Sequence, residues 1–512
     1  MDAVGNRTIS DLLDEQALCH GHRVAVVHEY QNGGASQLSF IQLRDAAQSV
    51  AAGLQARGVK PGDRVFVFMG NTAEYVPLWM GLMLAGAVIV AGNIYLTAPE
   101  VAYQLAHCQP ALVVVEPEHE ALIRDVCAGM DQAPEMVRIP RGSLGPQGLS
   151  CELAGAPDTF QPPMLGSDNL AQILYTSGTS ARPKGVMLTQ ANLLWCGQAG
   201  AANSGLSRVD RVFNNKPLFH ANCQETVLSC LTAGATAVIG ERYSASRYLR
   251  QLIEHRITVC SLSGMLCRTL LNQPPSPFDT AHQVRYAGYA INISEAEIEA
   301  FIQRFRIPLR NGYGQSESML YITLQSHSSP STYPSIGRPT PDREVFLVND
   351  DNQPVGVGEV GEIVVRGQPG RTLTLGYYQD PAATKAAFDG GWLHTGDLGY
   401  QDAKGNFFFF GRKKEVIKRA GENISAAEVE EALMGHPDVR DVAVVGIPDP
   451  VRDQSVKAFI VLHSERLEDV AAIKAYCATK LAYFKVPEHV EFMAELPRNA
   501  SGKVLKRALL GA

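Results

Sequence analysis

Short apolar runs alternate with amphipathic stretches from the N-terminus to about residue 320. The runs Arg64–Met69, Ala111–Glu116 and Ala235–Ile239 are rich in β-branched residues and predict buried strands. The stretches Phe40–Arg57 and Ser246–His255 carry apolar residues at helical spacing and predict helices. Strands separated by helices are typical of parallel α/β layers.

The pattern changes after about residue 340. Residues 340–410 combine short strands with frequent glycine turns, which predicts an antiparallel unit resembling a small β-barrel. The charged stretch Lys413–Arg419 follows, and then a compact pattern predicts helix Ala426–Gly435, strands Val439–Gly446 and Val456–Val461, and helix Leu467–Leu481. We therefore predict an α/β protein in two domains. The large N-terminal domain, 1–413, contains layered α/β subdomains and the β-barrel-like subdomain, and the small α/β C-terminal domain, 414–512, is mobile.

Composition excludes several classes of protein. The chain has 45 basic and 52 acidic residues among its 512, without a basic run, which argues against a nucleic-acid partner. Val76–Gly92 is uncharged, but it contains a proline and is shorter than the roughly 20 residues of a membrane-spanning helix. We expect a buried helix, a turn and a strand there. Ten scattered cysteines, without metal-ligand spacing, and an N-terminus unlike a secretory signal predict reduced thiols in the cytoplasm.

The segment Ile173–Val186, ILYTSGTSARPKGV, carries the clearest chemical signal. An apolar run leads into small hydroxyl residues and glycine, whose N–H and O–H groups can converge on phosphate oxygens. Lys184 adds a mobile cation. The string is neither a Walker loop nor a dinucleotide fingerprint. A solvated Ser/Thr-rich turn is the alternative interpretation, but the fixed order of hydroxyl residues before Pro-Lys-Gly favours phosphate binding.

The string resembles YTSGTTGxPKG, the signature loop of the superfamily of acyl-CoA synthetases, luciferases and peptide-synthetase adenylation domains. Ser180 and Ala181 depart from that pattern. Three further strings resemble family motifs in the same order, namely GYGQSE at 312–317, WLHTGDLG at 392–399 and PRNASGKVLKR at 497–507. The resemblance implies an ATP-dependent acid–thiol ligase that uses Mg²⁺ and takes CoA as co-substrate.

The resemblance also implies a role for each motif residue. Lys503, Thr176 and Glu317 are expected to be catalytic, with Glu317 holding Mg²⁺ and Thr176 as a further metal ligand. Tyr313 is expected to stack on adenine, and Asp397 to bind the ribose hydroxyls. The full set expected to bind ATP is Thr176, Ser177, Gly178, Thr179, Ser180, Lys184, Gly288, Ala290, Tyr313, Gly314, Ser316, Asp397 and Arg412.

The implied reaction has two steps. The substrate carboxylate, already ionised at pH 7, attacks the α-phosphorus of ATP, so that no side-chain nucleophile is required. The C-terminal domain is then expected to rotate about a hinge at Lys414, withdraw Lys503 and present Gly421, Glu422 and Asn423 to the incoming thiol.

The string FHANCQ at 219–224 matches the region between the acyl pocket and the thiol tunnel. The residues expected there are His220, Ala221, Asn222 and Gln224, with a packed core histidine as the alternative for His220. Amino-acid-activating relatives carry Asp at the position of Ala221, so an α-amino acid substrate is disfavoured, since its cation would lack a partner. Tyr289 stands where the family has Gly and is expected to narrow the tunnel, which favours a short or medium acid.

Several strings, among them YPSIGR at 333–338 and LPRNASGK at 496–503, resemble the bacterial crotonobetaine/carnitine–CoA ligases. In those ligases the string resembles FHIDCQ, which has Asp at the position of Asn222 in this chain. The loss of that carboxylate disfavours a cationic betaine and favours a neutral acid. A stand-alone adenylation enzyme loading a carrier protein remains an alternative, as does a luciferase-like oxygenase. The identity of the acid and the oligomeric state are left open.

Overall fold

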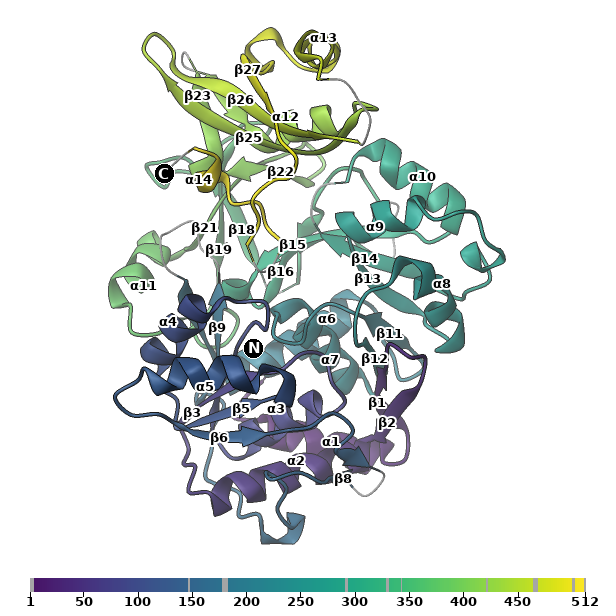
Figure 1. Ribbon diagram of the computed structural model, residues 1–512, viewed down its shortest axis with the longest axis vertical. Coiled ribbons are helices and arrows are strands. Elements are labelled where there is room, and N and C mark those ends of the chain that lie inside the picture. Colours follow the sequence, from purple (N-terminus) through teal and green to yellow (C-terminus); the bar gives the residue numbers. More distant parts are fainter. Residues whose placement is uncertain are drawn as a thin grey trace.

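The computed structural model describes residues 4–145, 148–176, 183–290, 293–327, 331–341, 343–419, 422–463, 468–499 and 502–510. Figure 1 shows a large lower body and a smaller C-terminal unit above it. Two large sheets dominate the lower body, and both are mainly parallel because most of their strands are joined through helices. The predicted α/β fold is therefore confirmed.

The nine-stranded sheet is parallel from β1 through β12, β11, β13 and β14 to β15, with antiparallel strands at both edges. Its order is β17 (Arg338–Pro339), β16 (Leu320–Leu324), β15 (Leu309–Gln315), β14 (Tyr286–Ala290), β13 (Val259–Ser263), β11 (Arg211–Asn214), β12 (Thr236–Gly240), β1 (Val24–Glu29) and β2 (Ala35–Ser39).

The seven-stranded sheet is parallel from β9 to β6 and ends in two antiparallel strands at the other edge. Its order is β20 (Gly376–Tyr377), β10 (Lys184–Thr189), β9 (Leu170–Thr176), β4 (Val88–Ala91), β3 (Arg64–Phe68), β5 (Leu112–Val115) and β6 (Glu135–Arg138). A short pair, β7 (Leu144–Gly145) and β8 (Gly148–Leu149), stands apart.

The largest hydrophobic core lies between these two sheets and contains residues of both sheets and of the helices between them. Those helices are α1 (Ile9–His20), α2 (Phe40–Ala56), α3 (Tyr75–Leu84), α6 (Gln190–Asn203) and α7 (Ala221–Ala233). Outer helices cover the other faces: α8 (Ala245–Glu254), α9 (Gly264–Leu271) and α10 (Glu295–Phe305) on the nine-stranded sheet, α4 (Ala98–Cys108) and α5 (Glu120–Ala128) on the seven-stranded one. Sheets covered on both faces explain the continuous apolar runs in the sequence.

Helix α3 accounts for the uncharged segment Val76–Gly92. It is buried on every side, and β4 follows it after a turn, as predicted. Within the described residues no helix is both long enough and apolar enough to cross a membrane. All ten cysteines lie in described parts of the chain, and none of them forms a disulfide.

The unit predicted as barrel-like is an open sheet, so that detail of the prediction is wrong. Four antiparallel strands lie in the order β18 (Glu344–Val348), β19 (Gly361–Arg366), β21 (Leu393–Gln401) and β22 (Phe407–Arg412), and the described residues contain no pairing between β18 and β22. Strand alternation and glycine turns predict hairpins, but they do not show whether the end strands meet. The short helix α11 (Pro381–Ala387) lies beside this sheet.

The C-terminal unit has a core of its own beneath a five-stranded sheet. Its strands are β23 (Val416–Arg419), β24 (Glu422–Ser425), β25 (Val439–Asp449), β26 (Asp453–Leu462) and β27 (His489–Phe492), and its helices are α12 (Ala426–Met434), α13 (Val470–Lys480) and α14 (Lys506–Leu509). The short 3-10 helices of the chain are η1 (Pro117–His119), η2 (Pro157–Thr159), η3 (Pro277–Asp279), η4 (Ser316–Ser318), η5 (Asp389–Gly391), η6 (Lys413–Glu415) and η7 (Tyr483–Lys485).

The segment η6 connects β22 of the four-stranded sheet with β23 of the C-terminal sheet, and the predicted hinge residue Lys414 is exposed within it. Lys413 pairs with Asp350 and Glu362 on the large body. The division into domains 1–413 and 414–512 stays a prediction, and in the structure it falls on this short link between two sheets.

Candidate active site

The two ends of the predicted phosphate loop meet at the end of a hairpin. Strands β9 and β10 pair antiparallel, and Thr176 stands opposite Lys184 in register. A side chain at Gly185 would press against Ile173 of the facing strand, so glycine permits this close pairing. Ser177, Gly178, Thr179 and Ser180, which the sequence places in the loop between the two strands, lie outside the described residues.

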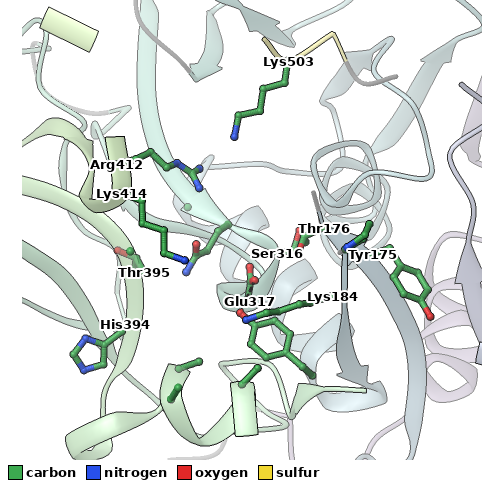
Figure 2. Close-up of a pocket in the computed structure, with 18 of the residues that line it drawn as sticks. Tyr175, Thr176, Lys184, Ser316, Glu317, His394, Thr395, Arg412, Lys414 and Lys503 are labelled. Atoms are coloured by element: carbon green, nitrogen blue, oxygen red, sulfur yellow. Dashed lines mark hydrogen bonds between the residues drawn. The ribbon is translucent and has the colours of Figure 1, made fainter. Parts of the chain in front are cut away.

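A cavity of about 850 Å³ opens in front of this hairpin, and residues of both predicted domains line it. Figure 2 shows Lys503 reaching into it from the C-terminal segment, opposite Thr176, Glu317 and Lys184. Nine residues that the sequence singled out line the cavity, namely Thr176, Lys184, His220, Gly314, Ser316, Glu317, Arg412, Lys414 and Lys503.

Glu317 is a nearly buried carboxyl at the cavity wall. It lies in η4, directly after β15, and its Oε1 accepts a hydrogen bond of 2.9 Å from the Tyr377 hydroxyl. The Lys184 amine sits over the Tyr377 ring, 4.7 Å from its centre. Burial raises the pKa of the Glu317 carboxyl, while the Tyr377 hydrogen bond and the charges of Arg412 and Lys184 lower it in part.

Asp397 and Tyr313 lie behind the cavity wall. Asp397 is 2% exposed, and its Oδ2 accepts a hydrogen bond of 2.7 Å from the Tyr313 hydroxyl. Arg412, opposite Asp397 on the neighbouring strand, holds its Nε 3.0 Å from Oδ1 of that carboxylate. Burial raises the pKa of the Asp397 carboxyl, and the Arg412 charge lowers it in part. Tyr313 packs beside the Phe409 ring and does not line the cavity.

A tight turn of the C-terminal segment holds Lys503 in the cavity. Asn499 accepts a hydrogen bond of 2.9 Å from the Lys503 amide, and Arg498 pairs with Asp441 on β25. Lys506 pairs with Glu415 at 3.2 Å and with Glu430 at 2.8 Å, which ties this segment to η6 and α12. Desolvation, and then the Arg412 charge, lower the pKa of the Lys503 amine.

His220 lines the cavity as the residue before α7, with its ring 4.8 Å from that of Phe219. His220 is exposed to the cavity, so the alternative of a packed core histidine is wrong, and the protein around the imidazole lowers its pKa and favours the neutral ring. Gln224 is fully buried, and its amide accepts from Gln172 at 2.8 Å and donates to the Leu218 carbonyl at 2.9 Å. Gln224 therefore connects α7 to β9 and does not face the cavity.

The remaining predicted pocket residues divide between the two faces of β14. Gly288 and Ala290 are partly exposed on the face that points toward α7. Tyr289 is 3% exposed and packs on the opposite face, in the cluster with Phe301. Because strand side chains alternate between faces, the expected narrowing of the tunnel by Tyr289 receives no support. Ala221 is buried at the start of α7, Glu422 is exposed on β24, and Gly421 and the Asn423 side chain lie outside the described residues.

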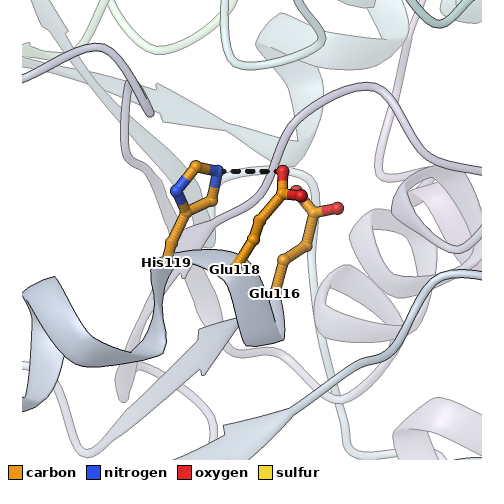
Figure 3. A group of neighbouring side chains, drawn as sticks. All are labelled: Glu116, Glu118 and His119. Atoms are coloured by element: carbon orange, nitrogen blue, oxygen red, sulfur yellow. Dashed lines mark ion pairs between the residues drawn. The ribbon is translucent and has the colours of Figure 1, made fainter.

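Another group of possible metal ligands lies elsewhere on the large body. Figure 3 shows Glu116, Glu118 and His119 together, with a dashed line for the ion pair between Glu118 and His119. The Glu118 carboxylate lies 3.4 Å from Nε2 of His119. Arg141 already compensates these carboxylates, at 2.7 Å from Glu116 and 3.1 Å from Glu118. Glu116 also accepts from the Gly70 amide at 2.6 Å. This group is a structural ion-pair network.

The sequence did not single out Tyr377, although it contacts both Glu317 and Lys184. Its strand β20 pairs with β10, almost two hundred residues earlier in the chain, so local pattern carries no signal for the contact. The sequence analysis also missed two charged residues inside the fold, Lys216 after β11 and Glu225 on α7. Each is a single charged residue in an otherwise uncharged stretch, and that was the only signal available for it.

Comparisons with known proteins agree with this geometry. The family model described as AMP-binding enzyme matches residues 13–378, and the one described as AMP-binding enzyme C-terminal domain matches residues 428–503. The chain is 36% identical over 520 residues to a crotonobetaine/carnitine–CoA ligase of Proteus mirabilis, covering 99% of this chain and all of that protein. A Salmonella typhimurium protein of the same name is 35% identical over 516 residues, again covering 99% and 100%.

Two solved structures share the whole architecture. The anthranilate CoA ligase AuaEII in complex with anthranoyl-AMP has a TM-score of 0.88 at 26% identity, covering 99% of this chain and 97% of that one. The o-succinylbenzoate coenzyme A synthetase MenE of Bacillus subtilis, in complex with ATP and a magnesium ion, has a TM-score of 0.84 at 27% identity, covering 98% and 99%. The chain belongs to the AMP-binding enzyme family and, within it, to the adenylate-forming acyl-CoA ligases.

Proposed function

We propose that the cavity between the two domains binds ATP and a carboxylic acid, and that the enzyme forms an acyl-AMP and then transfers the acyl group to CoA. The observation that carries the proposal is a set of three lysines, Lys184, Lys414 and Lys503, on the cavity wall. Among the described residues none of the three amines has a carboxylate within 4.0 Å, in contrast to Lys413 beside them. Unpaired amines around a cavity of this size suit a triphosphate.

The oxygen atoms at the inner wall fit a hard divalent ion. Glu317 has no lysine or arginine nitrogen within 4.0 Å among the described residues, and the Thr176 hydroxyl lines the same cavity. Mg²⁺ prefers carboxylate, hydroxyl, water and phosphate oxygens. Glu317, with Thr176 as a further ligand, would hold the ion, which supplies charge compensation for the phosphates. The MenE complex with ATP and a magnesium ion supports this assignment for the chain.

Adenylation then depends on position and charge. The substrate carboxylate forms a bond to the α-phosphorus, and pyrophosphate leaves with the electrons of the broken bond. Lys503 neutralises the charge that develops between the carboxylate and the α-phosphate, and Lys184 follows the leaving pyrophosphate. Desolvation and the Arg412 charge lower the pKa of the Lys503 amine, and a bound nucleotide anion would raise it. The Ser177–Ser180 loop and Ser316 donate hydrogen bonds to phosphate oxygens.

We assign the nucleoside to the region of Tyr313, Asp397 and Arg412. The Asp397 carboxylate is bonded to both Tyr313 and Arg412. We therefore propose that Arg412 releases this carboxylate when the ribose hydroxyls bind. Ala290 and Gly314 contribute backbone to the adenine side of the site, and Gly288, two residues earlier on β14, borders the acyl side.

Transfer to CoA requires the Lys503 segment to leave. We propose that domain 414–512 rotates about Lys414, carries Lys503 out of the cavity and brings Gly421, Glu422 and Asn423 to the thiol. His220 stays neutral and separates the acyl pocket from the thiol path without acting as a base. The CoA ligases among the relatives favour CoA over a carrier protein and over an oxygenase reaction. The free thiols suit a reducing compartment, and we propose the cytoplasm.

The Lys503→Ala variant tests the two-state account. We expect it to lose acid-dependent pyrophosphate release by at least about a hundredfold. Transfer of the acyl group from a supplied acyl-AMP to CoA should stay within about threefold of the wild type. Lys480→Ala, a lysine of α13 that does not line the cavity, is the matched control. Equal loss of both half-reactions would refute the proposed withdrawal of Lys503.

A further inference from the structure

Lys216 is a partly buried cation at the carboxyl end of a parallel strand. It follows β11, and its amine donates to the Ser261 hydroxyl at 3.0 Å and to the Leu262 carbonyl at 2.8 Å. Both partners are neutral, and among the described residues no carboxylate oxygen lies within 4.0 Å of the amine. An ammonium group has three donors, and this one uses two.

Asn222 supplies further donors on the other side of the Ser261 hydroxyl. Its Oδ1 accepts from Ser261 at 3.2 Å and from Asn214 at 3.1 Å, which leaves its amide nitrogen available to donate elsewhere. That nitrogen has no acceptor among the described residues. Ser261 therefore holds two groups, the Lys216 amine and the Asn222 amide, that both still have N–H donors to offer.

The fold leaves space beside these donors at Gly288. Gly288 stands beside Ser261 in the register of β13 and β14, and a side chain built at Gly288 would find only the Tyr321 hydroxyl, 4.0 Å away. Ser261, Gly288, Asn222 and Lys216 are all partly exposed although the sheet is covered on both faces. Ser261 and Gly288 are the middle residues of β13 and β14, and Lys216 follows the carboxyl end of β11. His220, two residues before Asn222, lines the main cavity.

Glu225 is the acidic residue whose charge acts on Lys216, but the two side chains do not form an ion pair. The Glu225 carboxyl accepts from Ser229 at 2.9 Å and lies against Gly200 of α6. Burial raises the pKa of the Glu225 carboxyl to about 7, so that a large share of it is uncharged near neutral pH. The Glu225 carboxyl lies between α6 and α7, whereas the Lys216 amine bonds to β13, so the carboxyl is not a direct partner of the amine.

The charge of Lys216 persists at neutral pH. Burial lowers the pKa of its amine to about 8, against which the neighbouring Cys223, Cys267, Glu225 and Cys260 raise it. A buried cation without an anionic partner is costly, and a ligand anion would remove that cost.

We propose that Lys216 and Asn222 bind a second carboxylate at the far end of the substrate, so that the acid activated by this enzyme is a dicarboxylic acid. This inference rests on the proposed function, since the first carboxylate is the one that is adenylated. A cationic acyl group would meet the Lys216 ammonium, and a neutral one would leave its third donor unused. The inference thus replaces the neutral acid that the sequence favoured.

The test compares α,ω-dicarboxylic acids with the monocarboxylic acids of equal chain length. Acyl-CoA formation is measured on the full chain with ATP, Mg²⁺ and CoA. We expect the wild type to prefer the dicarboxylic series by at least about tenfold in kcat/KM, as for a charge-assisted hydrogen bond. Lys216→Met should remove that preference by raising KM for dicarboxylic acids, while kcat/KM for monocarboxylic acids stays within about threefold.

Two further variants separate recognition from structure. Asn222→Asp places a negative charge beside Lys216 and should reduce the preference as well. Ser261→Ala keeps the ammonium and its bond to the Leu262 carbonyl but removes the hydroxyl that positions both donors, and should reduce the preference by less than Lys216→Met does. If the Lys216 variant does not fold, the wild-type preference alone decides. A wild type that prefers monocarboxylic or cationic acids overturns the inference and leaves the ligase function intact. Absence of acyl-CoA and pyrophosphate with every acid refutes the proposed function instead.

Discussion

Glu225 should make the stability of the large domain depend on pH. The carboxyl is buried on α7 and accepts a hydrogen bond of 2.9 Å from the Ser229 hydroxyl. Burial disfavours the ionised form and raises the pKa from 4.5 to about 7. A carboxyl whose pKa is raised on folding stabilises the protein fully below its unfolded pKa of 4.5. That contribution is lost as the pH rises through 7.

The magnitude follows from the shift. The difference between 4.5 and about 7 corresponds to on the order of 3 kcal/mol at about 1.36 kcal/mol per pKa unit. Glu225→Gln keeps the size and the acceptor oxygen of the side chain but cannot ionise. We therefore expect the variant to match the wild type near pH 4.5 and to exceed its unfolding free energy by about 1–3 kcal/mol above pH 7.

The assay is urea unfolding at several pH values, followed by tryptophan fluorescence, because Trp195 lies on α6 against the helix that carries Glu225. The variant and the wild type differ only at residue 225, so the contributions of the other titrating groups cancel in the difference between their unfolding free energies. Ser229→Ala removes the hydrogen bond to the carboxylate and should steepen the loss of stability with pH. Parallel stability curves for wild type and Glu225→Gln would show that Glu225 does not titrate in this range and would refute the reasoning.

Two further substitutions test contacts that only the folded chain creates. Tyr377→Phe removes the hydroxyl that donates to Glu317 and should weaken Mg²⁺-dependent ATP use by about tenfold, as for a hydrogen bond to a charged group. The measurement is the KM for Mg·ATP in pyrophosphate release, and an equal effect of the neighbouring Tyr378→Phe would contradict it. Gln224→Leu leaves the Gln172 amide without its buried acceptor and should lower the unfolding free energy by about 2 kcal/mol or more, seen as a lower urea midpoint. An unchanged midpoint would mean that this buried bond does not stabilise the fold.

Much of the fold was available from local pattern. The predicted helix Phe40–Arg57 is α2, Phe40–Ala56, and the predicted strand Arg64–Met69 is β3, Arg64–Phe68. The ends of these elements carry strong signals, such as Ser39, which accepts from the Gln42 amide at the start of α2. Period and capping are properties of neighbouring residues, so they can be read without the tertiary structure.

The candidate site was predictable to the extent that its residues stand in contiguous strings. Thr176, Glu317 and Lys503 were identified by resemblance of such strings, and the structure brings them to one cavity. The direction in which a side chain points was harder to predict from the sequence. Gln224 stands four residues after the cavity-lining His220 in the same string, yet its side chain is buried against Gln172 and the Leu218 carbonyl.

The sequence by itself therefore determined the class of fold, the family and the order of the motifs, because these depend on residue spacing along the chain. Only the tertiary structure decided that the four-stranded sheet stays open, that Tyr289 packs away from Gly288, and that Tyr377 reaches Glu317. It also decided the surroundings of Lys216, whose amine bonds to a strand 45 residues further along the chain. Whether a charged side chain has an ion-pair partner depends on residues that are distant in the sequence and close in space, so a local sequence pattern cannot show it.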